Sequence, residues 1–428
     1  MTTEQEIRAQ AEAAKMASYP LAALQVDVRN MALHAMADAL LGAAGMVLQE
    51  NAADLAAAKD AGMQPSYLDR LRLDMRRISD MAEGLRQTAE LPDPLGREDY
   101  SVRRPNGLEI RRLRVPLGVV GMIYEARPNV TADAIGLCLK SGNAVFLRGG
   151  SDALRSNRAI RDVLSHAAYA AGIPEGAIQL LAIKDRAAVD MMIHLTGLLD
   201  VIIPRGGAGL IRHVTEHSTV PVIETGAGIC HVYVDRAADV EMAIRIVQNA
   251  KVSRPSVCNA AETLLVHAEA AADFLPRMAK ILHADGVELR GCEKTCAILP
   301  DAVPAVEEDW RTEYGALILS IRIVSSIEEA IAHINRYNTG HSETIVTNDI
   351  RAAHIFQHAA DASTVYVNAS TRFTDGFEFG FGAEIGISTQ KLHVRGPMGL
   401  EALTSTKYLV YGEGQVRTSP AANTECCP

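Results

Sequence analysis

The sequence is poor in aromatic side chains: only 4% of its 428 residues are Phe, Trp or Tyr, and Trp occurs once. Few aromatics argue against a stacking platform for single-stranded nucleic acids or sugars. Excess positive charge is also missing, because 52 acidic residues outnumber 42 basic ones and give a net charge of −10. A nucleic acid or an anionic membrane is therefore not the expected partner. Any anionic ligand must be bound by local positive charge.

Cysteine is sparse and odd in number, with seven residues in the chain. This pattern is typical of free thiols in a reducing compartment, not of a disulfide framework. Long apolar runs are absent too, since none approaches the roughly 18 residues that span a bilayer. The polar start, MTTEQEIRAQ, does not resemble a signal peptide. These absences predict a soluble, cytoplasmic protein.

What is present begins with helical periodicity from residue 2 to about residue 91. A stretch of turn formers follows, and Pro105-Asn106-Gly107 predicts a hairpin between residues 100–104 and 108–114. A two-stranded ribbon is marginally stable alone. We expect it to pack on another chain or on another part of this one.

The middle of the chain alternates short apolar runs with segments long enough for a helix, which predicts parallel strands with helices on both faces. In such sheets, ligands bind at the carboxyl ends of the strands. A second alternating unit follows from about residue 232 to residue 367, and the Gly- and Phe-rich segment 373–386 is expected to be a shaped loop. The apolar runs of the first unit are 119–124, 144–147, 178–183, 201–204 and 222–224.

Cys258 is the most informative single residue, because it lies between an expected helix and an expected strand, in a loop that can expose its sulfur. Arg254 or Lys251 nearby would favour the thiolate, which is the nucleophilic form. Two interpretations are open at this point: a catalytic nucleophile or a buried structural thiol. Cys292 and Cys296, and likewise His354 and His358, lack the further ligands that a metal site needs, so we expect no metal.

Two Gly-rich turns follow expected strands: Arg148-Gly149-Gly150-Ser151 and Arg205-Gly206-Gly207-Ala208-Gly209. Backbone amides at a helix N-terminus bind anions, and glycine lets a phosphate approach closely. Simple glycine turns are the alternative. Both turns at one sheet edge favour a dinucleotide, and the arginine at the first turn favours NADP(H).

Three further side chains are candidates for binding a carboxylate or an oxyanion. Arg127 and Asn129 lie where a strand ends and a helix begins, and Arg372 precedes the Gly/Phe-rich loop. The alternatives are that Asn129 caps the helix and that Arg372 is an ordinary surface arginine.

Four blocks in order resemble the γ-glutamyl phosphate reductase family, also called glutamate-5-semialdehyde dehydrogenases, a branch of the aldehyde dehydrogenase superfamily. The blocks are VPLGVVGMIYEARPNVT at 115–131, SGNAVFLRGGSDALRSN at 141–157, SRPSVCNAAETLLVH at 253–267 and AIAHINRYNTGHSETIVT at 330–347.

The resemblance implies an α/β, aldehyde dehydrogenase-like fold. Its parts would be a Rossmann-type NADP-binding domain (1–100 and 116–227), an α/β catalytic domain (228–385), a small β oligomerisation arm (101–115 and 400–416) and a flexible tail (417–428). A homo-oligomer is implied. The implied cofactor-binding residues are Arg148, Gly149, Ser151, Arg205, Gly206, Gly207 and Glu313.

The implied reaction is the NADPH-dependent reduction of γ-glutamyl phosphate to glutamate 5-semialdehyde and phosphate, the second step of proline biosynthesis. Cys258 would form a thioester, Asn129 would serve the oxyanion, and Arg127 and Arg372 would bind substrate. Transient contact with glutamate 5-kinase is a further expectation. The alternative is a hydrolytic aldehyde dehydrogenase that oxidises a small aldehyde, with Glu224 activating water.

Overall fold

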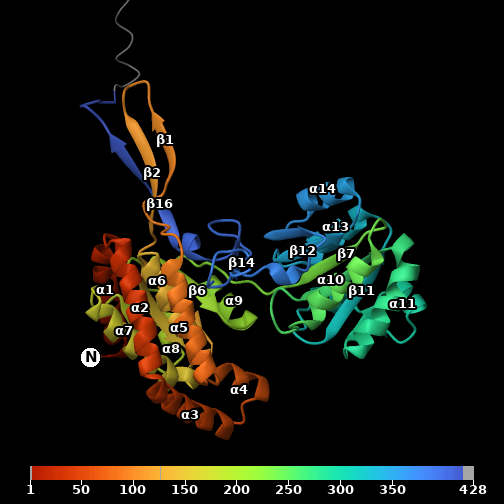
Figure 1. The fold of residues 1–428 in the computed structure, drawn as a ribbon, viewed down its shortest axis with the longest axis horizontal. Helices are drawn as coiled ribbons and strands as arrows, with labels where there is room; N and C mark the ends of the chain where they lie inside the picture. The colour runs from red at the N-terminus through yellow and green to blue at the C-terminus, as the bar shows by residue number, and fades with distance from the viewer. Residues whose placement is uncertain (1, 126, 418–428) are drawn as a thin grey trace, which may run out of the picture.

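The computed structural model describes residues 2–125 and 127–417. The chain forms two α/β lobes joined by extended connections, and a β-ribbon arm projects from the first lobe (Figure 1). Within these described ranges no single helix is long and apolar enough to span a membrane; the bent pair α2 and α3 meets that criterion by length and composition alone.

The first lobe begins with five helices, which confirms the helical prediction for the first 91 residues. Helix α5 shows why they pack: Asp74 caps its first turn by accepting from the Arg77 amide at 2.8 Å, and its apolar face, including Ile78 and Leu85, is buried. The five helices are α1 (Thr3–Ala22), α2 (Val26–Gly42), α3 (Ala44–Asp60), α4 (Pro65–Leu71) and α5 (Met75–Glu90).

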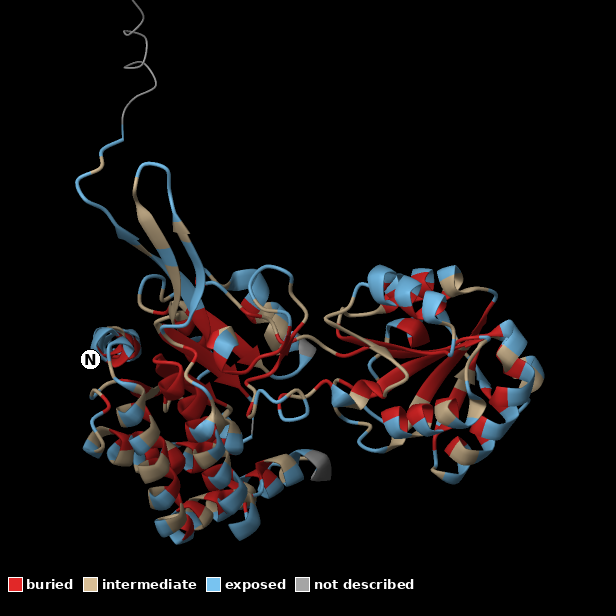
Figure 2. Ribbon diagram, turned by 45° about the horizontal axis from the view of Figure 1, so that its top comes forward, coloured by how far each residue is buried: buried red, intermediate tan, exposed pale blue. Residues whose placement is uncertain are grey.

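The sheet of the first lobe has four parallel strands in the order β5-β4-β3-β6. Its elements are β3 (Val119–Tyr124), α6 (Asn129–Lys140), β4 (Ala144–Gly149), the 3₁₀ helix Ser151–Ala153, α7 (Leu154–Ala170), β5 (Ile178–Leu180), α8 (Ala187–Met192), β6 (Val201–Arg205) and α9 (Ala208–His217). The strands are almost wholly buried, as the parallel arrangement requires (Figure 2).

The expected fifth strand at 222–224 is wrong in extent. Val222 makes a single β-bridge with Ile202, and the Glu224 amide donates instead to the side chain of Gln390 at 3.0 Å. The chain leaves the sheet at this point because the Glu224 amide is bonded to Gln390, in the segment that returns to the first lobe, and not to a neighbouring strand.

The second lobe contains a seven-stranded, wholly parallel sheet in the order β10-β9-β11-β8-β7-β12-β13. Its elements are β7 (Cys230–Val234), α10 (Val240–Val252), β8 (Ala261–His267), α11 (Ala268–Ala284), β9 (Glu288–Gly291), α12 (Glu293–Ile298), β10 (Val303–Pro304), the 3₁₀ helix Glu307–Arg311, β11 (Ile318–Val324), α13 (Ile327–Tyr337), β12 (Ser342–Val346), α14 (Ile350–Ala359), β13 (Thr364–Val367) and the 3₁₀ helix Thr371–Phe373.

The chain then returns to the first lobe, where Ala383, Ile385 and Met398 join the core that also contains β3, β4 and β6. This segment holds β14 (Ile387–Ser388), β15 (Gly396–Pro397) and the 3₁₀ helix Leu400–Leu403. The expected domain boundary at 385 therefore lies inside a segment that already packs on the first lobe.

The arm is a three-stranded antiparallel sheet in the order β1-β2-β16. β1 (Glu98–Arg103) and β2 (Glu109–Pro116) form the predicted hairpin, and β16 (Thr404–Tyr411) pairs with β2 along its whole length. The hairpin is thus supported by a strand from the far end of the chain. The expected tail, 417–428, lies outside the described residues except for Arg417.

Candidate active site

Cys258 lies in the loop between α10 and β8, at the amino-terminal edge of the second lobe's parallel sheet. The loop is pressed against β7: a Cβ on Gly228 would lie 1.6 Å from the carbonyl oxygen of Cys258, so only glycine fits there. The same carbonyl accepts from the thiol of Cys230 at 3.2 Å. The backbone beneath Cys258 is therefore fixed, while its own side chain is half-buried.

Burial raises the pKa of the Cys258 thiol to about 11, and among nearby charges Arg205 lowers it while Glu313 and Glu384 raise it. Arg205 comes from β6 of the first lobe, so the principal cation near the thiol belongs to the other lobe. Of the two cations predicted to favour the thiolate, Arg254 or Lys251, the second is buried in an ion pair with Glu262 at 2.5 Å.

The Lys251–Glu262 pair supports the loop that carries Glu313. Glu262 accepts from the amide of Gly315 at 3.2 Å through its second oxygen, and the hydroxyl of Tyr314 donates to Asp309 at 2.9 Å. Burial raises the pKa of Glu262 to about 7 and lowers that of Lys251. The chain is thus anchored directly after Glu313, whose own side chain is exposed.

Arg372 reaches back to the Cys258 loop. Its Nε donates to the hydroxyl of Ser253 at 3.0 Å, and its Nη1 donates to the side-chain oxygen of Asn259. Asn259 in turn donates to the carbonyl of Thr374 at 2.9 Å. The guanidinium therefore joins both ends of the loop that presents Cys258, so it is more than an ordinary surface arginine.

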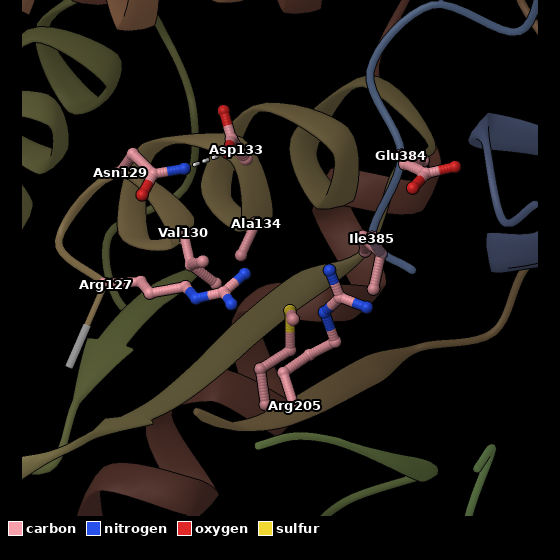
Figure 3. A pocket seen from close by; sticks show the side chains of 9 residues that line it. Arg127, Asn129, Val130, Asp133, Ala134, Arg205, Glu384 and Ile385 are labelled. Carbon is pink, nitrogen blue, oxygen red and sulfur yellow. Dashed lines mark hydrogen bonds between the residues drawn. The ribbon is translucent and has the colours of Figure 1, made fainter. Parts of the chain in front are cut away.

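A cavity of about 70 Å³ lies at the edge of the first lobe's sheet (Figure 3). It is lined by four charged side chains, two arginines and two acids, together with Asn129 and apolar atoms. The charged residues are Arg127, Arg205, Asp133 and Glu384.

The two arginines of this cavity come from the ends of neighbouring strands, β3 and β6. Among the described residues neither forms an ion pair with a carboxylate. Burial, then Arg70 and Arg205, lower the pKa of Arg127. The two guanidinium groups thus have no paired carboxylate among the described residues, although two acidic side chains line the same cavity.

Asn129 is the first residue of α6 and does not cap it, because the capping position is Pro128 and no side chain caps the helix. Its amide donates instead to Asp133 at 3.2 Å, within the cavity. Sequence reasoning did not identify Asp133 or Glu384. The only signal for Glu384 was its position at the end of the Gly/Phe-rich loop.

The first Gly-rich turn is closely packed. A Cβ on Gly149 would lie 2.1 Å from the amide nitrogen of Asn157, on α7. The buried Nδ2 of Asn157 and Nε of Arg148 have no hydrogen-bond partner, whereas Arg148 donates to the carbonyls of Gly149 at 2.9 Å and of Lys184 at 3.5 Å. Ser151, at the start of the following 3₁₀ helix, is exposed.

The second turn places Gly206 and Gly207 at the start of the ten-residue helix α9. The Gly207 amide donates to the carboxylate of Glu125 at 2.8 Å. The Glu125 carboxylate thus lies at the N-terminus of α9, where the helix dipole favours negative charge. Both turns follow the carboxyl ends of parallel strands in the same sheet.

The remaining described thiols are held by local contacts. Cys138 is buried in the first core, and Cys296 donates to the carbonyl of Gly291 at 3.3 Å. Among residues 2–125 and 127–417, no group of three or more His, Cys, Asp or Glu side chains is arranged to hold a metal ion. Cys426 and Cys427 lie outside the described residues.

Comparison with known proteins agrees with this arrangement. The model of the aldehyde dehydrogenase family matches residues 1–288 and 289–408. A γ-glutamyl phosphate reductase from Moorella thermoacetica is 58% identical over 417 residues, which cover 97% of this chain and 100% of that one. The chain belongs to the γ-glutamyl phosphate reductase branch of the aldehyde dehydrogenase family.

The crystal structure of γ-glutamyl phosphate reductase from Thermotoga maritima matches this reductase-family chain with a TM-score of 0.95 and 47% identity, covering 96% of this chain and 100% of that chain. A glyceraldehyde-3-phosphate dehydrogenase from Methanocaldococcus jannaschii, solved with NADP, shares the fold at 16% identity and a TM-score of 0.68, over 96% of this chain and 95% of that one. The predicted fold is confirmed, and the family uses a nicotinamide cofactor.

Proposed function

We propose that this protein reduces γ-glutamyl phosphate to glutamate 5-semialdehyde and inorganic phosphate, with NADPH as the reductant. The observation that carries the proposal is the position of Cys258: a thiol on a fixed loop, acted on by Arg205 and Glu384, which also line the charged cavity. The 58% identity to a γ-glutamyl phosphate reductase supports the same reaction.

Cys258 acts as the nucleophile. Its thiolate sulfur forms a bond to the acyl carbon, the bond between that carbon and the phosphate oxygen breaks, and phosphate leaves with the electron pair. The negative charge that develops on the carbonyl oxygen needs nearby donors, for which we propose the Cys258 amide and the Asn129 side chain. Arg205 counters the negative charge of the thiolate and of the approaching acyl phosphate.

The two Gly-rich turns are the proposed cofactor site, with Glu313 at the nicotinamide ribose. The unpartnered Nε of Arg148 and Nδ2 of Asn157 support an anionic ligand, and the Gly207 amide would exchange its bond to the Glu125 carboxylate for one to a phosphate oxygen. Bound there, NADPH supplies the hydride that reduces the thioester. Preference for the 2′-phosphate is supported by a second cavity, of about 480 Å³, whose lining includes Arg155, Arg158 and Lys184.

The arm is the proposed oligomerisation element. Tyr408, Val410 and Tyr411 on β16 and Tyr100 on β1 are 45–55% exposed. Exposed apolar side chains on a projecting ribbon are typical of a surface that another copy covers.

The test of the function is the phosphate dependence of the reverse reaction. The purified protein is supplied with glutamate 5-semialdehyde and NADP⁺, and NADPH formation is followed with phosphate or with sulfate at equal ionic strength. We expect turnover only with phosphate, and a loss of at least roughly 10⁴-fold in Cys258→Ala, which should still bind NADPH. Undiminished oxidation without phosphate would contradict the proposal.

A further inference from the structure

The cavity at Arg127 and Arg205 has a charge pattern that does not suit a phosphate group. Asp133 and Glu384 lie in its wall, and their carboxylates would repel a dianion. A zwitterion suits it better, because the cations meet a carboxylate and the acids meet an ammonium group. The volume of about 70 Å³ holds several water-sized groups, which is room for a small polar head.

The cavity also lies beside the reacting thiol. Glu384 and Arg205 line it and are at the same time two of the charges that act on Cys258. A ligand whose head fills the cavity therefore directs a short chain towards the sulfur. γ-Glutamyl phosphate has this form, with a zwitterionic α-amino-acid head joined by methylene groups to the acyl carbon.

We infer that this cavity is the subsite for the α-amino-acid head of the substrate, with Arg127 binding the α-carboxylate and Asp133 and Glu384 binding the α-ammonium group. The inference rests on the proposed function and adds the two acids as determinants of specificity. Asn129 holds Asp133 through its amide at 3.2 Å, and the Gly376 amide donates to Glu384 at 2.9 Å, so both acids are oriented before substrate arrives.

The protonation behaviour of the two acids agrees with this role. Burial raises the pKa of Asp133 to about 6 and that of Glu384 to about 7, and the negative charge of Asp375 contributes to the second. An ammonium group bound beside either acid would favour its ionised form. Arg205 lowers the pKa of both acids, but neither acid forms an ion pair with another described residue. A substrate ammonium group would supply such a partner.

The experiment compares two aldehydes in the phosphate-dependent oxidation with NADP⁺: glutamate 5-semialdehyde, and 5-oxopentanoate, which lacks only the α-amino group. The variant Asp133→Asn/Glu384→Gln removes both charges with little change in shape. We expect it to lower the ratio of kcat/KM for glutamate 5-semialdehyde to that for 5-oxopentanoate by roughly tenfold to a hundredfold; the ratio is the readout because the effect of Glu384 on Cys258 acts on both aldehydes alike. Glu378→Gln, an exposed site on the same loop, is the matched control.

A measurement without turnover separates binding from chemistry. In full-length Cys258→Ala, calorimetry should show that L-glutamate binds more tightly than glutarate, and that adding Asp133→Asn/Glu384→Gln removes the difference. Equal losses on both aldehydes, or no loss on either, would overturn the inference. If the wild-type protein oxidises neither aldehyde with phosphate, the proposed function itself has failed.

Discussion

Cys258 must ionise in surroundings that oppose its thiolate. Burial and the carboxylates of Glu313 and Glu384 raise its pKa to about 11, whereas the positive charge of Arg205 lowers it; Arg372 also interacts with the Cys258 thiolate. At neutral pH the free protein therefore holds the thiol mostly protonated.

Removing the charge of Glu384 tests this balance. In Glu384→Gln a negative neighbour is lost, so the thiolate is favoured and the pKa of Cys258 falls. The rate of alkylation by iodoacetamide, followed against pH, should reach its midpoint at a lower pH than in the wild-type protein. Glu378→Gln should leave the midpoint unchanged, and an equal or higher midpoint in Glu384→Gln would show that the two groups do not interact.

The arm illustrates how an element depends on distant sequence. Its hairpin was predicted from Pro105-Asn106-Gly107, and the pairing of β16 with β2 supplies the third strand. The outer strands β1 and β16 are nevertheless largely exposed in a single chain. Their stability in solution is expected to come from contact with a second copy.

Charged residues on β16 should therefore dissociate the oligomer. We expect Tyr408→Asp/Val410→Asp to sediment as a smaller species than the wild-type protein. The two aspartates would place negative charge where apolar side chains contact the second copy. Tyr19→Asp, which changes an equally exposed tyrosine on α1, is the control and should not alter the sedimentation coefficient. A double variant of wild-type size would refute the role of β16 in assembly.

Elements were predictable where local pattern decides them. The parallel strands of the first sheet follow from continuous apolar runs, yet the run at 222–224 looked the same and formed only one bridge. This run does not continue as a strand because the Glu224 amide donates to the side chain of Gln390, 166 residues later in the chain. Such a partner has no signature in the local sequence.

At the scale of the whole molecule, the active site is assembled from both lobes and from the returning segment. The sequence pointed to Cys258, Arg127 and the Gly-rich turns one at a time, because each lies at the end of a recognisable element. It did not show that Arg205 would face the thiol, or that Asp133 and Glu384 would share a cavity with Arg127. Convergence of side chains from distant segments depends on tertiary packing.

The distribution of charge over the whole molecule bears on how it binds anionic ligands. With a net charge of −10, the protein repels anions in general, while basic side chains line both cavities beside acidic ones. The two cavities contain arginines from β6, α7 and the turn after β3. The prediction that anionic ligands meet local positive charge agrees with this distribution.

The central claim is that Cys258 takes the acyl group from an acyl phosphate, and mass spectrometry of the intact protein tests it most directly. Glutaryl phosphate is the suitable probe, because it lacks the amine that would cyclise a glutamyl thioester. Incubated without NADPH, the wild-type protein should gain the mass of one glutaryl group, mapped to Cys258 and removed by hydroxylamine, while Cys258→Ala gains none. An adduct on another residue, or equal labelling of Cys258→Ala, would contradict the account.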